Sequence, residues 1–256
     1  MSNFEELHLK LEFVGTERFV DGNNLKEMSN CLTQLKKLTF NILSTIRHDD
    51  QMNFISNENI ENTFTNWKFN EVISCVDYFS EKFEGQCHIY SCPYRWRKYD
   101  QITNHFPGGL FHCVREISLF DDRPFEHQFF LRIAQSFPAI EVITLRNDKP
   151  QKKKQSRKSS KNQSVSLIDY PHLRELDLLE AHEDYYEEFL LHTLIFLPNF
   201  LRLFADYRQL KKATHRFQRN ATRLNCSRIH SLCLLSSSDR LSKHFKQYFP
   251  RTHLVK

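Results

Sequence analysis

The sequence predicts an α/β fold in which short parallel strands form one face and helices form the other. Two observations in the 256-residue chain carry this prediction. A six-residue pattern of three apolar anchors, separated by two variable residues and then by one, recurs along the chain. Helical segments lie between several of its copies. A strand followed by a helix, stacked several times, gives a solenoid with parallel strands. We also expect an irregular, hairpin-containing insertion in this array.

The repeat pattern has seven copies. Their central apolar residues are Leu7, Leu38, Ile117, Ile143, Leu176, Leu203 and Leu232, separated by steps of 31, 79, 26, 33, 27 and 29 residues. The copy at 173–178 (LRELDL) is complete, whereas the copy at 200–205 (FLRLFA), with Phe200 as its first anchor, is weak. Most of the steps lie in or near the 20–29 residue spacing of leucine-rich repeats. We therefore expect one leucine-rich-repeat-like domain over residues 1–256.

The segments between the copies predict the helices. Pro138, Pro171 and Pro198 each stand two residues before the first anchor of a copy, where proline ends a helix and favours an extended backbone. Apolar spacing predicts helices over 124–137 and 183–197, a short helix over 24–32, and a less convincing basic helix over 209–223. We expect the aromatic residues of these helices to fill the core, which accounts for the 23 phenylalanines.

Residues 47–112 interrupt the repeats and form the irregular segment. Its first part, 47–61, reads as a polar loop, and 60–67 as a possible helix. The apolar runs 72–79 and 86–91, on either side of a turn containing Gly85, predict a hairpin or two strands that join the sheet. Residues 100–106 read as a helix that stops at Pro107.

The positive charge of the chain is concentrated in one segment. Residues 149–161 (KPQKKKQSRKSSK) hold seven basic residues and no acidic one, and without them the formal net charge falls from +5 to −2. Nothing apolar in this segment can offset the entropy of ordering, so we expect a disordered basic loop over 149–165. Its candidate site residues are Lys152, Lys153, Lys154, Arg157 and Lys158. The alternative is a nuclear-import signal or a binding patch for nucleic acid or an anionic surface.

Composition and motifs argue against several functions. The chain has only 5 glycines, and it contains no G-x-S-x-G, H-E-x-x-H, G-x-G-x-x-G or P-loop motif, so we expect no enzyme activity and no cofactor. We also expect no metal site, because no familiar zinc spacing joins Cys87, His88, Cys92, His105, His112 and Cys113. The seven cysteines, with no secretory signal, favour a reducing compartment, the cytoplasm or the nucleus. No apolar run approaches the roughly 20 residues that span a bilayer, so we expect no membrane partner.

The variable positions inside each copy predict the binding surface. Residues between the anchors of a strand point away from the core, so they form a ladder on the uncovered side of the sheet. The ladder mixes both signs of charge with aromatic side chains, which favours a protein partner and makes a nucleic acid unlikely. The candidate partner-binding residues are Phe120, Arg146, Asp177, Arg202, Phe204 and Asp206.

Three stretches of the chain resemble a known family. Residues 106–138 (FPGGLFHCVREISLFDDRPFEHQFFLRIAQSFP), 170–178 (YPHLRELDL) and 21–28 (DGNNLKEM) are similar to the repeat region of divergent F-box proteins with leucine-rich-repeat-like tails. The resemblance implies a substrate receptor of an SCF-type ubiquitin ligase, in which the F-box docks a Skp-type adaptor and the repeats hold an unknown target protein. No F-box precedes Phe4 in the sequence, so adaptor docking is expected only of a longer product.

Overall fold

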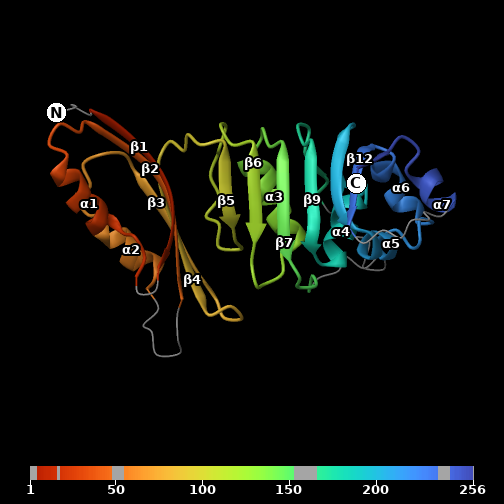
Figure 1. The fold of residues 1–256 in the computed structure, drawn as a ribbon, viewed down its shortest axis with the longest axis horizontal. Coiled ribbons are helices and arrows are strands. Elements are labelled where there is room, and N and C mark those ends of the chain that lie inside the picture. Colours follow the sequence, from red (N-terminus) through yellow and green to blue (C-terminus); the bar gives the residue numbers. More distant parts are fainter. Residues whose placement is uncertain (1–4, 16–17, 48–54, 153–165, 236–242, 256) are drawn as a thin grey trace. The chain divides into compact units, whose positions relative to one another are not determined.

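The computed structural model describes residues 5–15, 18–47, 55–152, 166–235 and 243–255. The chain groups into two compact units, Met1–Trp96 with His105–Pro107, and Arg97–Asn104 with Gly108–Lys256. Both units contain a sheet and helices (Figure 1), and the predicted mixed α/β class is confirmed. No helix in the described part of the chain is both long and apolar enough to cross a membrane.

The first unit is built on a four-stranded sheet. The strands are β1 (Glu6–Gly15), β2 (Lys37–Arg47), β3 (Val72–Phe79) and β4 (Glu84–Ser91), in the order β1-β2-β4-β3. The first two copies of the repeat form β1 and β2, which pair in parallel with Leu7 opposite Leu38. Strands β3 and β4 pair antiparallel around residues 80–83, so the hairpin predicted in the irregular segment is present.

Two short helices, α1 (Gly22–Cys31) and α2 (Asn57–Thr63), belong to this unit. Both begin with a capping box, in which Asp21 and Ser56 accept backbone N–H groups of the first turn and so satisfy donors that a helix start leaves open. Gly22 donates its N–H to Oγ1 of Thr63 at 2.8 Å, and a Cβ at position 22 would lie 2.5 Å from the Thr63 carbonyl oxygen. The start of α1 therefore requires glycine, because it touches the end of α2.

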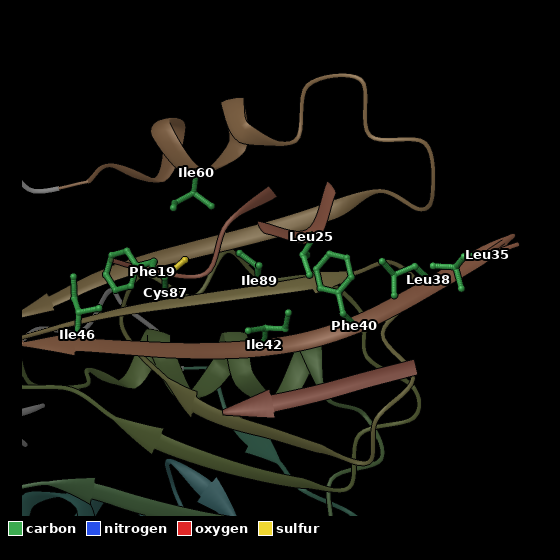
Figure 2. Packing of buried hydrophobic residues seen from close by; sticks show 10 residues of the cluster. All are labelled: Phe19, Leu25, Leu35, Leu38, Phe40, Ile42, Ile46, Ile60, Cys87 and Ile89. Carbon is green, nitrogen blue, oxygen red and sulfur yellow. The ribbon is translucent and has the colours of Figure 1, made fainter. Parts of the chain in front are cut away.

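The core of the first unit lies between the sheet and these helices. Figure 2 shows Leu38, Phe40 and Ile42 of β2 together with Leu25 of α1 and Ile60 of α2. None of the ten side chains drawn is more than 7% exposed. Burial of this apolar surface is the dominant stabilising contribution to the unit.

The second unit is built on seven parallel strands. They are β5 (Lys98–Ile102), β6 (Glu116–Phe120), β7 (Val142–Asn147), β9 (Glu175–Ala181), β11 (Leu201–Asp206), β12 (Ile229–Leu235) and β13 (His253–Val255). Their order in the sheet is their order in the chain. A separate pair of two-residue strands, β8 (Ile168–Asp169) and β10 (Ile195–Phe196), also pairs in parallel. A sequential parallel sheet is what stacked strand-helix units produce.

Among the described residues, five helices connect these strands. They are α3 (His127–Ser136), α4 (Glu183–Leu190), α5 (Tyr207–Ala213), α6 (Asn220–Cys226) and α7 (Lys243–Tyr248). Right-handed crossovers, the rule for parallel strands, place such helices on one side of a sheet, and α3 and α4 lie behind the strands in Figure 1. The hydroxyl of Tyr186 on α4 donates to the Leu178 carbonyl of β9 at 2.7 Å, which ties this helix to the sheet.

Three predicted helices and one predicted loop differ from the structure. The helix predicted over 183–197 ends at Leu190, and residues 195–196 form β10 instead. Helix α2 begins at Asn57, inside the stretch 47–61 that was predicted as a loop. The basic segment 209–223 forms two short helices instead of one, because His215, Arg216 and Phe217 all adopt left-handed backbone conformations between them. The helix predicted over 100–106 is wrong, since residues 98–102 form β5. Tyr99, which is 2% exposed, lies opposite Ile117, so pairing with β6 and burial of this ring outweigh the local helical pattern.

Aromatic rings fill the helix side of the second unit, as the sequence predicted. Phe125 stacks on Phe129 with ring centroids 4.1 Å apart, and Phe130 meets Phe189 of α4 edge to face at 5.2 Å. These four side chains are at most 4% exposed. Offset and edge-to-face pairs add to the stability gained by burial alone.

The repeats are divided between two sheets, whereas the sequence predicted one continuous array. The copies at Leu7 and Leu38 lie in the four-stranded sheet, and the other five lie in the seven-stranded sheet. The 79 residues between the anchors Leu38 and Ile117 explain this division. Strand β4 pairs antiparallel with β2, from Asn41 opposite Tyr90 to Arg47 opposite Glu84. It therefore occupies the edge of β2 that a following parallel repeat would need.

Candidate functional site

The anchors of the repeat form one continuous row across the seven-stranded sheet. Residues paired directly between neighbouring strands are Tyr99, Ile117, Ile143, Leu176, Leu203, Leu232 and Leu254. The first six are at most 2% exposed, whereas Leu254 on the edge strand β13 is 50% exposed. The sequence pattern therefore reports the true register of the sheet.

The positions between the anchors lie on the other side of the sheet, because side chains alternate along a strand. We call this side the open face and define it by Glu116, Ser118, Phe120, Val142, Thr144, Arg146, Glu175, Asp177, Arg202, Phe204, Ser231 and Cys233. All twelve retain some solvent exposure, in contrast to the buried anchors beside them.

The open face brings two of the predicted site residues together on β6 and β7. Phe120 is half-buried and lies directly opposite Arg146. The Arg146 guanidinium lies 3.4 Å from a carboxylate oxygen of Glu180 on β9, and both side chains are more than half exposed. An exposed ion pair of this kind contributes little to stability, so Arg146 is available to a partner.

Asp177, Phe204 and Arg202 form a second group. Phe204 is half-buried and lies opposite Asp177, whose carboxylate accepts the backbone N–H of Leu179 at 3.0 Å. Arg202, two residues before Phe204, is 55% exposed and lies 3.4 Å from Glu175. Arg202 on β11 lies two strands away from Arg146 on β7, which is about 10 Å across the sheet. It is also offset from Arg146 by four residues, which is about 13 Å along the strands. A ligand that touches both groups must span roughly 16 Å.

Asp206 has a structural role that the sequence reading did not consider. Its carboxylate accepts the backbone N–H groups of Arg208 at 2.8 Å and Gln209 at 3.1 Å, and so caps the start of α5. Capping by aspartate stabilises a helix by about 1 kcal/mol. The conformation of Asp206 is therefore explained without a partner.

Of the five candidate residues in the basic loop, the structure describes only Lys152. Its side chain is exposed, and its backbone N–H donates to Glu126 at 2.8 Å. Lys153, Lys154, Arg157 and Lys158 lie outside the described residues. The neighbouring Gln151 donates its backbone N–H to Asp184 at 3.0 Å and its side-chain amide to Glu188 at 3.2 Å. The chain is thus held on the helix side of the sheet at Gln151, near the start of the basic segment.

A buried ion pair holds both flanks of this segment. His127 is 6% exposed, and its Nδ1 lies 2.6 Å from a carboxylate oxygen of Glu188, which is 3% exposed. Its Nε2 lies 2.9 Å from the carbonyl oxygen of Ser166. Both partners only accept hydrogen bonds, so the imidazolium, with two N–H donors, is the form that satisfies both. Burial opposes the charge, but the hydrogen bond and attraction of Glu188 prevail and raise the pKa of His127 above its usual value.

The structure also contains a groove that sequence reasoning missed. It has a volume of about 580 Å³ and lies where β7, β9, β11 and β12 begin. The turns before these strands supply much of its wall, including Arg174 and Phe200, and His230 of β12 lines it as well. Arg202 and Glu175 of the open face line it too, so the groove continues the second group of candidate residues.

Phe200 at the rim of the groove corrects the predicted repeat. The sequence assigned Phe200 as a buried first anchor, but it is 77% exposed, and the buried residues of this copy are Leu201, Leu203 and Ala205. Its φ of 67° is left-handed, which costs a residue other than glycine about 1–2 kcal/mol. In the sequence, the only sign that Phe200 is not a buried anchor is that residues 200–205 match the repeat pattern poorly. Exposed aromatic rings in strained backbone are typical of binding sites.

The cysteines considered for metal binding have other environments. Cys87 is fully buried in the core of the first unit, and burial raises the pKa of its thiol, so it packs as a small apolar residue. Within the described ranges, no three histidine, cysteine or acidic side chains gather as a metal site would require. The open face and the groove present aromatic rings, arginines and carboxylates.

Comparison of the chain with family models, with curated proteins and with solved structures found no match. What the site can bind follows from its own residues.

Proposed function

We propose that the chain is a non-enzymatic protein-interaction module whose second unit is a leucine-rich-repeat-like solenoid that binds a protein through the open face. By the resemblance of residues 106–138 and 170–178, its role would be the substrate-recognition region of an F-box-type ubiquitin-ligase receptor. The sequential order of β5 to β13 and the helices between them support the solenoid part of this proposal.

The observation that carries the proposal is the composition of the open face. Arg146 and Arg202 are more than half exposed, and half-buried phenylalanines, Phe120 and Phe204, lie beside them. Aromatic residues and arginine are the types enriched in protein-protein interfaces and their energetic centres. Glu175 and Glu180, each paired with one of these arginines, break the positive stripe that a nucleic acid would require.

Affinity capture from cell extract with quantitative mass spectrometry tests the proposal. The variant R146E/R202E reverses both exposed arginines of the open face, and R208E/K246E makes the same charge change at exposed positions of α5 and α7. We expect a partner that wild type and R208E/K246E retain and that R146E/R202E loses. Thermal unfolding checks that both variants fold. The proposal fails if the folded R146E/R202E variant retains every partner.

A second capture experiment separates the open face from the basic loop. Removing 153–161 takes out five of the basic residues while keeping the contacts of Gln151 and Lys152. A protein-recognition module keeps its partner after this deletion. Loss of a salt-sensitive interaction would instead favour binding of nucleic acid or an anionic surface through residues 149–161. For a longer product that carries an F-box, we expect a Skp-type adaptor and a cullin among the captured proteins, in the cytoplasm or the nucleus.

A further inference from the structure

The groove has the dimensions of a site for a short extended peptide. It crosses the first residues of four neighbouring strands, from Val142 of β7 to Ser231 of β12. Adjacent strands lie about 4.8 Å apart, so the groove is roughly 14 Å long, the length of about four extended residues. A second hollow of about 140 Å³ adjoins it, and Asn199, Phe200 and His230 line both.

The two hollows carry an excess of positive charge. Their walls contain four arginines, Arg174, Arg202, Arg228 and Arg251, against two glutamates, Glu141 and Glu175. The chain as a whole has the opposite sign of net charge, −2, when the basic segment 149–161 is left out. The groove therefore attracts an anionic ligand more strongly than the surrounding surface does.

Both glutamates already face arginines. Glu175 lies 3.4 Å from Arg202, and Glu141 lies 3.6 Å from Arg115 and 3.9 Å from Arg174. Arg228 is held in place by a 2.6 Å hydrogen bond to the Leu197 carbonyl. This arrangement pre-orients the guanidinium groups, whose planar shape fits carboxylates in a bidentate manner.

Phe200 supplies the apolar part of the site. Its ring stands at the junction of the two hollows, and the centroid of the His230 ring lies 5.6 Å from its own. An aromatic ring that is 77% exposed can gain most of its buried area from a ligand. The site thus combines one apolar anchor with surrounding cationic groups.

We propose that this groove binds a short acidic peptide segment of the partner protein, with an apolar side chain against Phe200 and carboxylates against Arg174 and Arg202. The proposal rests on the proposed function, because it assigns one segment of the protein that the open face recognises. A peptide fits better than a nucleic acid, since Glu141 and Glu175 would repel a continuous phosphate backbone, whereas a peptide backbone is neutral.

Fluorescence anisotropy with defined probes tests the peptide site. The probe is a fluorescein-labelled octapeptide of alternating glutamate and leucine. The matched probes are the same peptide with glutamine or with lysine in place of glutamate, and a single-stranded octanucleotide. We expect the glutamate peptide to bind, its affinity to fall with salt, and F200A and R174Q each to weaken binding by about tenfold. F83A is the matched control, because Phe83 is also exposed (54%) and left-handed (φ 52°) but lies in the β3-β4 turn.

Three results would overturn the peptide site. They are equal binding of the glutamine peptide, tighter binding of the octanucleotide in competition with the peptide, or unchanged binding by F200A. The capture experiment separates this inference from the proposed function. If no peptide binds but R146E/R202E still loses the captured partner, only the peptide site is refuted. If every folded variant keeps every partner, both are refuted.

Discussion

Replacing His127 with glutamine should destabilise the protein more in mild acid than in mild base. The imidazolium of His127 donates to the Glu188 carboxylate at 2.6 Å and to the Ser166 carbonyl at 2.9 Å, with both ion-pair side chains almost fully buried. A hydrogen bond to a charged group contributes about 1.5–3 kcal/mol. Because glutamine can keep one donor, we expect H127Q to lower the free energy of unfolding by about 2–3 kcal/mol at about pH 5.5.

The sign of the pH dependence follows from the raised pKa of His127. A group whose pKa is higher in the folded state stabilises fully below its unfolded pKa, about 6.5, and loses that stabilisation as pH rises through the folded value. Above the folded pKa only an ordinary neutral hydrogen bond remains, so we expect the cost of H127Q to be smaller at about pH 8.5 than at about pH 5.5, and to fall toward about 1 kcal/mol as the neutral form is reached.

Urea unfolding followed by circular dichroism, at both pH values, measures this difference. The control is H112Q, at an exposed histidine of the same unit, which should match wild type at both pH values. The alternative results are that H127Q lowers the free energy of unfolding equally at the two pH values, or more at the higher pH. Either result would refute the assignment of a buried, charged His127 that is hydrogen-bonded to Glu188 and Ser166.

Three further predictions concern single positions. Leu176 is fully buried in the anchor row, so L176A should lower the free energy of unfolding by about 3 kcal/mol in urea titration, whereas T144A on the open face should change it by less than about 1 kcal/mol. Asp206 caps α5, so D206A should cost about 1 kcal/mol while D206N retains both the stability and the captured partner; loss of the partner by D206N would show a direct binding role. Phe200 is left-handed, so F200G should be more stable to urea than F200A by about 1 kcal/mol, and the reverse order would show that the left-handed backbone is wrong.

The repeat pattern predicted five of the seven strands of the second unit's sheet, β6, β7, β9, β11 and β12. The anchors Ile117, Ile143, Leu176, Leu203 and Leu232 pair directly across five strands, because a buried row tolerates no slip of one residue without exposing all its members. The same alternation placed Arg146, Arg202 and Phe204 on the open face.

Other features depended on contacts that a local pattern does not contain. Residues 100–106 have helical spacing, but pairing of β5 with β6 decides their structure. The repeats at Leu7 and Leu38 match the pattern as well as the later copies, yet the pairing of β2 with β4 assigns them to another sheet. Phe200 occupies an anchor position in the sequence pattern. In the structure its backbone is left-handed, and its exposed ring lines the groove, which the local pattern does not predict.

Photo-cross-linking from the open face tests the central claim most directly. A benzophenone amino acid in place of Phe204 lies between Asp177 and Cys233 in the middle of the open face, whereas the same group in place of the exposed Lys211 lies on α5. The account predicts that irradiation in cells yields a cross-linked partner protein from position 204, absent from position 211 and lost in R146E/R202E. Cross-linking to a protein from position 211 with none from position 204 would contradict it.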